Sequence, residues 1–121
     1  MLTNGNVGIG ASNPSKKLHM EFTENVASEG LLVNNLGNSG SNLHLKSSGA
    51  GGRDYILQST GSANSTGAGF FSIYDGTASE NRLTINSTGH AGIGGTSDNG
   101  AFLDVIGTTR GELVGIPGLY Q

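Results

Sequence analysis

The chain has 121 residues, enough for one domain, and a formal net charge of −3 with only 12% charged residues. Without a basic stripe it lacks the electrostatic footprint of a nucleic-acid-binding protein, and without cysteine it has no disulfides and no thiolate chemistry. No run approaches the roughly 20 apolar residues of a membrane span. We therefore predict neither nucleic-acid binding nor membrane insertion.

Large apolar residues are scarce: Leu, Ile, Val and Phe together make up 28 of the 121 residues, whereas glycine alone accounts for 22. Ordering a glycine-rich chain costs much conformational entropy. A monomer with so few apolar residues has little to bury against that cost. We therefore expect apolar surface that is shared between chains.

A connector opens the chain and returns near its end. Leu2–Gly10, L-T-N-G-N-V-G-I-G, is the same phrase as L-T-I-N-S-T-G-H-A-G-I-G at 83–94, with a shorter turn. Each copy precedes a polar loop and a closing strand, Leu18–Met20 in the first copy and Leu103–Val105 in the second. A repeat after about 84 residues is too widely spaced for a solenoid. We interpret the chain as one central module between two connectors, whose glycines allow close approach to another backbone.

Short strands with turn residues between them fill the rest of the chain. Pro14 indicates a turn before the first closing strand, and a helical turn is conceivable only at 23–30. Alternating or β-rich patterns predict strands at 18–22, 31–33, 42–46, 54–59, 70–74 and 82–86. Such spacing is typical of a sandwich or barrel, so we predict an all-β fold: a small antiparallel β-sandwich or barrel-like module with flanking Gly-rich connectors.

The resulting organisation has four parts. They are an N-terminal connector and strand at 1–30, a central antiparallel β module at 31–86, a second connector and strand at 87–107, and a C-terminal tail at 108–121.

Three blocks carry a resemblance to a known family. They are G-G-R-D-Y-I-L-Q-S-T-G at 51–61, G-F-F-S-I-Y-D at 69–75 and R-L-T-I-N-S-T-G-H-A-G-I-G at 82–94. Together with G-N-V-G-I-G-A-S-N-P-S-K-K-L-H-M at 5–20, they resemble modules of bacteriophage tail-fibre and tailspike proteins. The resemblance implies a homotrimeric, β-structured virion part. From the sequence itself we expect a protein that is made in the host cytoplasm, is not an enzyme and has no cofactor.

The chain departs from that family in two respects. It ends at Gln121 without the C-terminal self-cleaving chaperone domain, and it starts directly in the connector. We therefore expect a short fibre segment or a capsid-decoration (cement) protein. The alternative is a carbohydrate-binding receptor-recognition module at a fibre tip, which would contact a host surface glycan.

Candidate interaction residues follow from these patterns. For the trimer interface we predict Val7, Ile9, Ile93, Leu103 and Val105. The tail is too apolar for a free end, so we predict that it docks on other virion proteins of the capsid or tail through Leu113, Val114, Ile116, Leu119 and Tyr120. For the alternative, Phe70 and Tyr74 are the candidate glycan contacts.

Catalytic and metal sites find little support in the sequence. The glycines Gly5, Gly8 and Gly10 invert the order of the dinucleotide fingerprint. The three histidines lie on separate segments, and only their stacking on a trimer axis would offer a metal site. The carboxylates Asp54, Asp75, Asp98 and Asp104 have no tryptophan and little bulk nearby for a sugar cleft, and Asp75 before Gly76 is typical of a turn.

Overall fold

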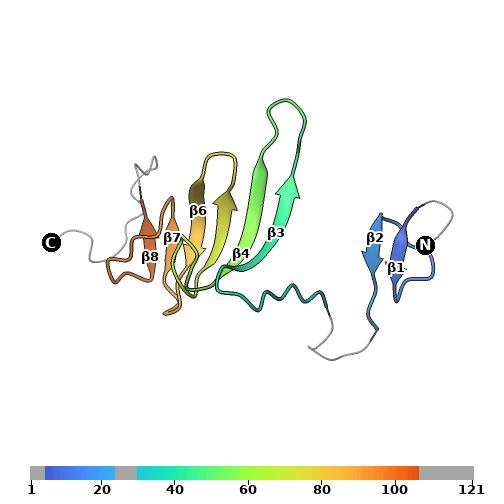
Figure 1. Ribbon diagram of the computed structural model, residues 1–121, viewed down its shortest axis with the longest axis horizontal. Coiled ribbons are helices and arrows are strands. Elements are labelled where there is room, and N and C mark those ends of the chain that lie inside the picture. Colours follow the sequence, from blue (N-terminus) through green and yellow to red (C-terminus); the bar gives the residue numbers. More distant parts are fainter. Residues whose placement is uncertain (1–4, 24–29, 107–121) are drawn as a thin grey trace, which may run out of the picture. The chain divides into compact units, whose positions relative to one another are not determined.

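The computed structural model describes residues 5–23 and 30–106, and the chain divides into two compact units, Met1–Leu32 (unit 1) and Val33–Gln121 (unit 2). The described residues form eight strands and connecting loops, with no helix (Figure 1). The all-β prediction is confirmed for this part of the chain.

Unit 1 contains two short parallel strands, β1 (Val7–Ile9) and β2 (Leu18–Met20). Parallel neighbours usually need a crossover of a dozen or more residues. Here residues 10–17 suffice, because the loop runs tightly over one face of the pair. A Cβ on Gly8 would collide with the carbonyl oxygen of Ala11 and lie 3.0 Å from the Pro14 ring, so this position requires glycine.

Unit 2 is one open sheet of six strands in chain order (Figure 1). The strands are β3 (Gly40–Lys46), β4 (Asp54–Thr60), β5 (Phe71–Asp75), β6 (Glu80–Ile85), β7 (Ala91–Ile93) and β8 (Leu103–Val105). Pairing is antiparallel from β3 to β7 and parallel between β7 and β8. A register shift between Ile73 and Tyr74 leaves Arg82 as an extra residue on β6.

The strand register gathers large apolar residues on one side of the sheet, the apolar face. One row of directly paired residues crosses all six strands: Leu43, Leu57, Ile73, Leu83, Ile93 and Val105. Alternation along the strands adds Leu45, Tyr55, Phe71, Ile85, Ala91 and Leu103 to the same face.

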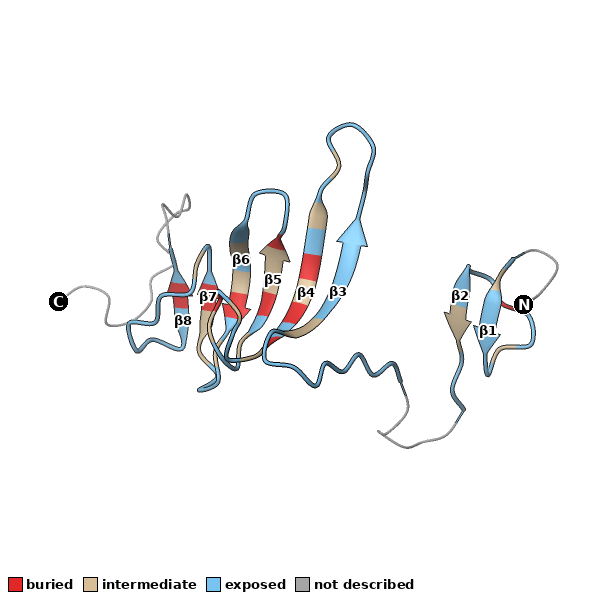
Figure 2. Cartoon of the chain, viewed as in Figure 1, coloured by how far each residue is buried: buried red, intermediate tan, exposed pale blue. Residues whose placement is uncertain are grey.

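The opposite, polar face is the buried one (Figure 2). Gln58, Ser72, Thr84 and Asp104 are buried on this face, and the loop after β7 forms hydrogen bonds with Thr84 and Asp104. The Ser72 hydroxyl donates to Gln58 Oε1 at 3.2 Å, and Thr66, from the loop at 61–69, donates to Asn81 Oδ1 at 3.3 Å. No buried side-chain nitrogen or oxygen in the described part lacks a partner. Among the described residues, the sheet of unit 2 is thus covered on its polar side and largely exposed on its apolar side.

Most predicted strands are present, with ends shifted by a few residues. The expected barrel is wrong, because the sheet of unit 2 is open. The described strands also leave no second layer for a sandwich, since all six join one sheet. Residues 31–33 are not a strand, and the helical turn expected at 23–30 falls largely on residues 24–29, outside the described part.

The connector glycines lie close to other backbone segments of the same chain. A Cβ on Gly92 would lie 2.8 Å from Thr84 Oγ1 and 3.0 Å from the carbonyl oxygen of Gly95, both in the same chain. Gly94 has φ +85° and lies against the backbone of Ile106. The glycines therefore permit the tight crossover loop of one chain, and no approach of other chains is needed to explain them.

Candidate functional site

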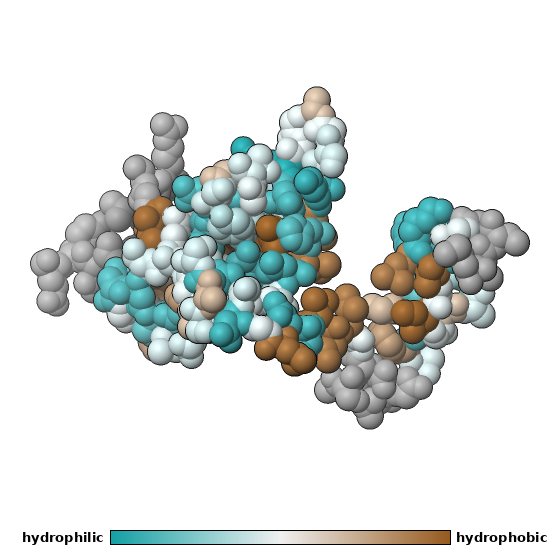
Figure 3. Space-filling view, viewed as in Figure 1, coloured by the Kyte–Doolittle hydropathy of each residue, from teal (hydrophilic) through white to brown (hydrophobic). Residues whose placement is uncertain are grey.

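The apolar face is the most distinctive surface of unit 2. Eight of its side chains are 39–58% exposed: Leu43, Leu45, Tyr55, Phe71, Ile85, Ile93, Leu103 and Val105. Ile56, on the other face, is the one large apolar residue in the described part that is buried, with 7% exposed. Soluble monomers rarely expose so continuous an apolar patch. Hydrophobic surface is visible on both units in Figure 3.

The predicted interface residues divide between the two units. Ile93, Leu103 and Val105 lie together on the apolar face, at the β7–β8 end of the sheet. Val7 and Ile9 are exposed on β1 of unit 1, paired with Leu18 and Met20. In both units the apolar residues flank a glycine, Gly8 in β1 and Gly92 in β7. The loop that joins the two parallel strands, the crossover loop, covers the other side of this glycine.

A charged cluster borders the apolar face at the end of β5. Asp75 is only 1% exposed and receives hydrogen bonds from Arg53 Nη1 and Arg82 Nη2, each at 2.8 Å. Its other oxygen accepts the backbone N–H groups of Thr77 and Ala78, at 3.1 Å each. The hydrogen bond from Arg82 lowers the pKa of Asp75 below its ordinary value, against the opposing effect of burial. Asp75 is therefore the turn residue that the sequence indicates and also an ion-pair centre.

Neither arginine was predicted from the sequence. Arg53 is 22 residues before Asp75 and Arg82 is 7 residues after it, and only the sheet brings the three together. The turn at Asp75-Gly76 could have indicated Arg82. The strand after a tight turn runs back beside the strand before it, which brings Arg82 near Asp75.

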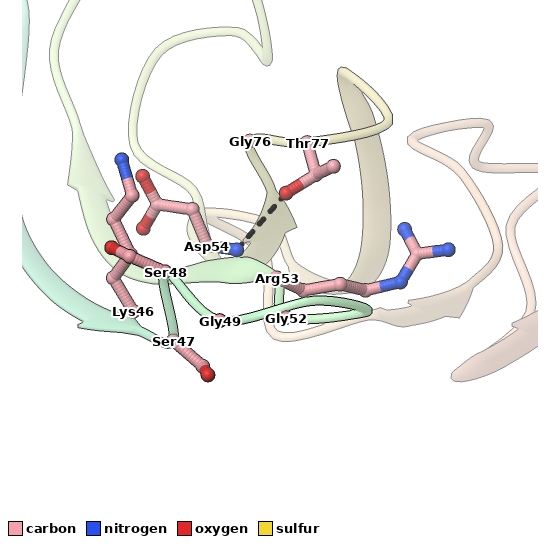
Figure 4. A pocket seen from close by; sticks show the side chains of 9 residues that line it. All are labelled: Lys46, Ser47, Ser48, Gly49, Gly52, Arg53, Asp54, Gly76 and Thr77. Atoms are coloured by element: carbon pink, nitrogen blue, oxygen red, sulfur yellow. Dashed lines mark hydrogen bonds between the residues drawn. The ribbon is translucent and has the colours of Figure 1, made fainter.

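A polar groove of about 450 Å³ lies at the β3–β4 hairpin tip beside the β5–β6 turn (Figure 4). Its lining residues are Lys46, Ser47, Ser48, Gly49, Gly52, Arg53, Asp54, Gly76 and Thr77. Asp54 pairs with His44 Nδ1 at 3.0 Å, and its backbone N–H donates to Thr77 Oγ1 at 3.0 Å. With a single carboxylate, this groove offers hydrogen bonds to a polar ligand but no acid pair for glycoside hydrolysis.

The candidate glycan contacts do not line that groove. Phe70 and Tyr74 are both half-buried, Phe70 just before β5 and Tyr74 near its end. Four residues along a strand span about 13 Å, so the two rings do not form one patch. The backbone of Phe70 is fixed by Thr60, whose hydroxyl accepts the Phe70 N–H at 2.8 Å.

Two histidines pair with single carboxylates. His90 Nδ1 lies 3.0 Å from Asp98 Oδ1, and Asn86 Nδ2 donates to Asp98 Oδ2 at 2.7 Å. The hydrogen bond from His90 lowers the pKa of Asp98 from its ordinary value. In the described part of the chain, no three His, Asp or Glu residues come together as metal ligands.

No family model matches the sequence, and no curated protein matches it. Within the described residues, no helix is long and apolar enough to cross a membrane. The predicted docking residues Leu113, Val114, Ile116, Leu119 and Tyr120 lie outside the described part.

Proposed function

We propose that the chain is a structural protein of a phage virion, a homotrimer that forms a fibre segment or decorates the capsid. The observation that carries the proposal is the bare apolar face, which crosses all six strands of unit 2 while the polar face is covered by the chain's own loops. The resemblance of the connector and the 51–75 blocks to tail-fibre modules supplies the virion context.

The physical argument concerns what covers this face. Completing the burial of a half-exposed large apolar side chain contributes about 1 kcal/mol, and eight such side chains lie on each copy. Three sheets that turn these faces toward a common axis create a core that the single sheet lacks. The product is a stiff projection whose role is mechanical, so no catalytic group is required.

The oligomeric state is the first test. We expect light scattering after size exclusion to give a mass of three chains of 12.2 kDa at micromolar concentration. Ile73→Asp, at the centre of the apolar row, should abolish the trimer, whereas Ser87→Asp in an exposed turn should leave it intact. A folded wild-type monomer or dimer would contradict the proposal.

Attachment to the particle is the second test. Truncation after Gly107 removes the apolar tail, and we expect a trimer that no longer associates with virions in co-sedimentation. A truncated protein that decorates particles as well as the full chain would exclude the tail as the docking segment.

Carbohydrate binding is the second candidate, and the groove of about 450 Å³ at the β3–β4 hairpin tip favours it. Lys46, Asp54 and the serines of the tip offer donors and acceptors that suit sugar hydroxyls. A glycan array separates the two functions, because a purely structural trimer binds none of the sugars. If a sugar binds, Lys46→Ala should weaken binding and leave the trimer intact.

A further inference from the structure

A second hollow lies beside the polar groove at the β3–β4 hairpin. It has a volume of about 480 Å³ and is lined by Leu45, Lys46, Ser47, Arg53 and Tyr55. Lys46, Ser47 and Arg53 also line the polar groove. The second hollow differs from that groove in having an aromatic ring in its lining and no carboxylate. Its charged lining residues are therefore both positive.

The hairpin places four of these five residues on the apolar face. Leu45 pairs directly with Tyr55, and alternation puts Ser47 and Arg53 on the same side, one step nearer the tip. The Ser47 N–H donates to Arg53 O at 3.0 Å. A Cβ on Gly52 would collide with the carbonyl oxygen of Ser47, so the tip can close here only around a glycine. The fold thus sets Arg53 next to a tyrosine that is 40% exposed.

Arg53 is held by Asp75 but shares that carboxylate with a second arginine. Asp75 Oδ2 accepts from Arg53 Nη1 at 2.8 Å, and from Arg82 Nη2 and Nε at 2.8 and 3.3 Å. Two arginines on one buried carboxylate leave one positive charge in excess. The Arg53 side chain is 46% exposed and makes no other hydrogen bond to the described residues. Its remaining N–H groups can therefore bind an anion.

The excess positive charge lies on the Arg53 side of the cluster. The hydrogen bond to Asp75 raises the pKa of Arg82, and nearby Tyr55 and Glu80 add to this effect. Glu80 therefore partly compensates the charge of Arg82. Figure 4 shows the guanidinium of Arg53 extending away from Asp54, the carboxylate of the polar groove. Arg53 is thus oriented by one carboxylate and kept apart from the other.

We propose that this second hollow binds an acidic sugar residue, with the sugar carboxylate on Arg53 and one face of the ring against Tyr55. The planar guanidinium offers parallel N–H groups that match the two oxygens of a carboxylate. The C–H groups on one face of a sugar ring are apolar and cover the exposed aromatic ring. The Ser47 hydroxyl and the Lys46 ammonium meet the ring hydroxyls. The inference rests on the carbohydrate-binding candidate and narrows it to anionic sugars.

NMR titration of the full-length chain with small probes tests the proposal. Glucuronate and glucose share a ring, and only glucuronate has a carboxylate. We expect glucuronate to shift the Arg53 side-chain and Tyr55 ring signals, and glucose to bind about tenfold more weakly, because it lacks the charge-assisted hydrogen bonds. Acetate has the carboxylate without the ring, so it should bind about three- to tenfold more weakly than glucuronate.

Two variants separate the site from a general effect of charge. Arg53→Gln should lower the affinity for glucuronate about tenfold, to that for glucose. It should remain folded, because Asp75 keeps its bonds to Arg82 and to two backbone N–H groups. Lys16→Gln is the matched control, since it removes one exposed positive charge from unit 1. It should leave the affinity unchanged.

Three results would overturn the proposal. Equal affinities for glucose and glucuronate would exclude an acidic ligand and leave carbohydrate binding standing. Glucuronate shifts confined to Asp54 and Thr77 would place the sugar in the polar groove instead. No shift with any probe at its highest soluble concentration would exclude this site, and the glycan array then decides whether the chain binds carbohydrate elsewhere. The oligomeric state, measured on the same samples, tests the structural role separately.

Discussion

The two connectors have the same backbone arrangement, but different side chains form the hydrogen bonds that hold the loop to the strands. In unit 1, Asn6 Nδ2 donates to Pro14 O at 3.0 Å; at the equivalent positions of unit 2, His90 bonds to the carboxylate of Asp98. In both connectors, the central residue of the closing strand accepts a backbone N–H of the crossover loop. In unit 1, His19 Nδ1 accepts from the Ser15 N–H, and in unit 2, Asp104 Oδ2 accepts from the Asn99 N–H.

The difference teaches which features of a connector are fixed by geometry. The glycines at Gly8 and Gly92 are identical, because a Cβ at either would meet the crossover loop. The bridging side chains vary freely, provided that a donor meets an acceptor. The first connector uses an amide and an imidazole side chain, whereas the second uses an imidazole and two carboxylates. Four comparisons of equivalent positions test this interpretation.

The largest effect is expected at the apolar residue of each connector. Ile93 is 43% and Ile9 is 52% exposed in the single chain. If both face a shared trimer core, Ile93→Asp and Ile9→Asp bury unpaired like charges, which cost several kcal/mol each. We expect dissociation or misfolding on native electrophoresis, with Ser87→Asp as the normal control. Intact, equally heat-resistant trimers for all three would make these isoleucines ordinary surface residues.

The glycines come next. Gly8→Ala and Gly92→Ala each force a Cβ into the crossover loop, and we expect each to destabilise its own unit by about 1–3 kcal/mol. Gly49 is the matched control, because a Cβ there has nothing within 4 Å. Urea unfolding measured by NMR, unit by unit, gives the comparison. A Gly92→Ala chain as stable as Gly49→Ala would contradict the steric argument.

The repeat itself could be predicted from the sequence, because glycines and closing strands recur at fixed spacing and the register Gly8–His19 matches Gly92–Asp104. The side-chain hydrogen bonds Asn6–Pro14 and His90–Asp98 could not be predicted, since Asn6 and His90 are different residue types. Alternation also gave the two faces of each strand, but not which face is covered. That depends on the loop at 61–69, whose small polar residues carry no signal of where it folds.

A smaller effect is expected at the central residue of each closing strand. Asp104 is buried, so Asp104→Ala leaves the N–H of Asn99 without its acceptor, and we expect a loss of about 1–3 kcal/mol. His19 is only half-buried and its contact with Ser15 is longer, 3.3 Å against 3.1 Å, so His19→Ala should cost about 0.5 kcal/mol. Thermal unfolding of the two variants measures the order. Equal losses would show that burial does not set the strength of this bond.

The smallest effect is a difference in acid response between the connectors. The bond from His90 lowers the pKa of Asp98 in the folded chain, so its contribution to stability is present above the unfolded pKa of about 4 and is lost as pH falls through the folded value. The first connector has Pro14 at this position, with no group to titrate. Asp98→Asn should remove part of the acid destabilisation of β7–β8 below about pH 4 and leave β1–β2 unchanged. Exchange at Gly92 and Gly8 between pH 3 and 6, corrected for the intrinsic pH dependence of exchange, is the measurement. The same acid response in Asp98→Asn and wild type would assign the loss to another carboxylate, with Asp75 the first to examine.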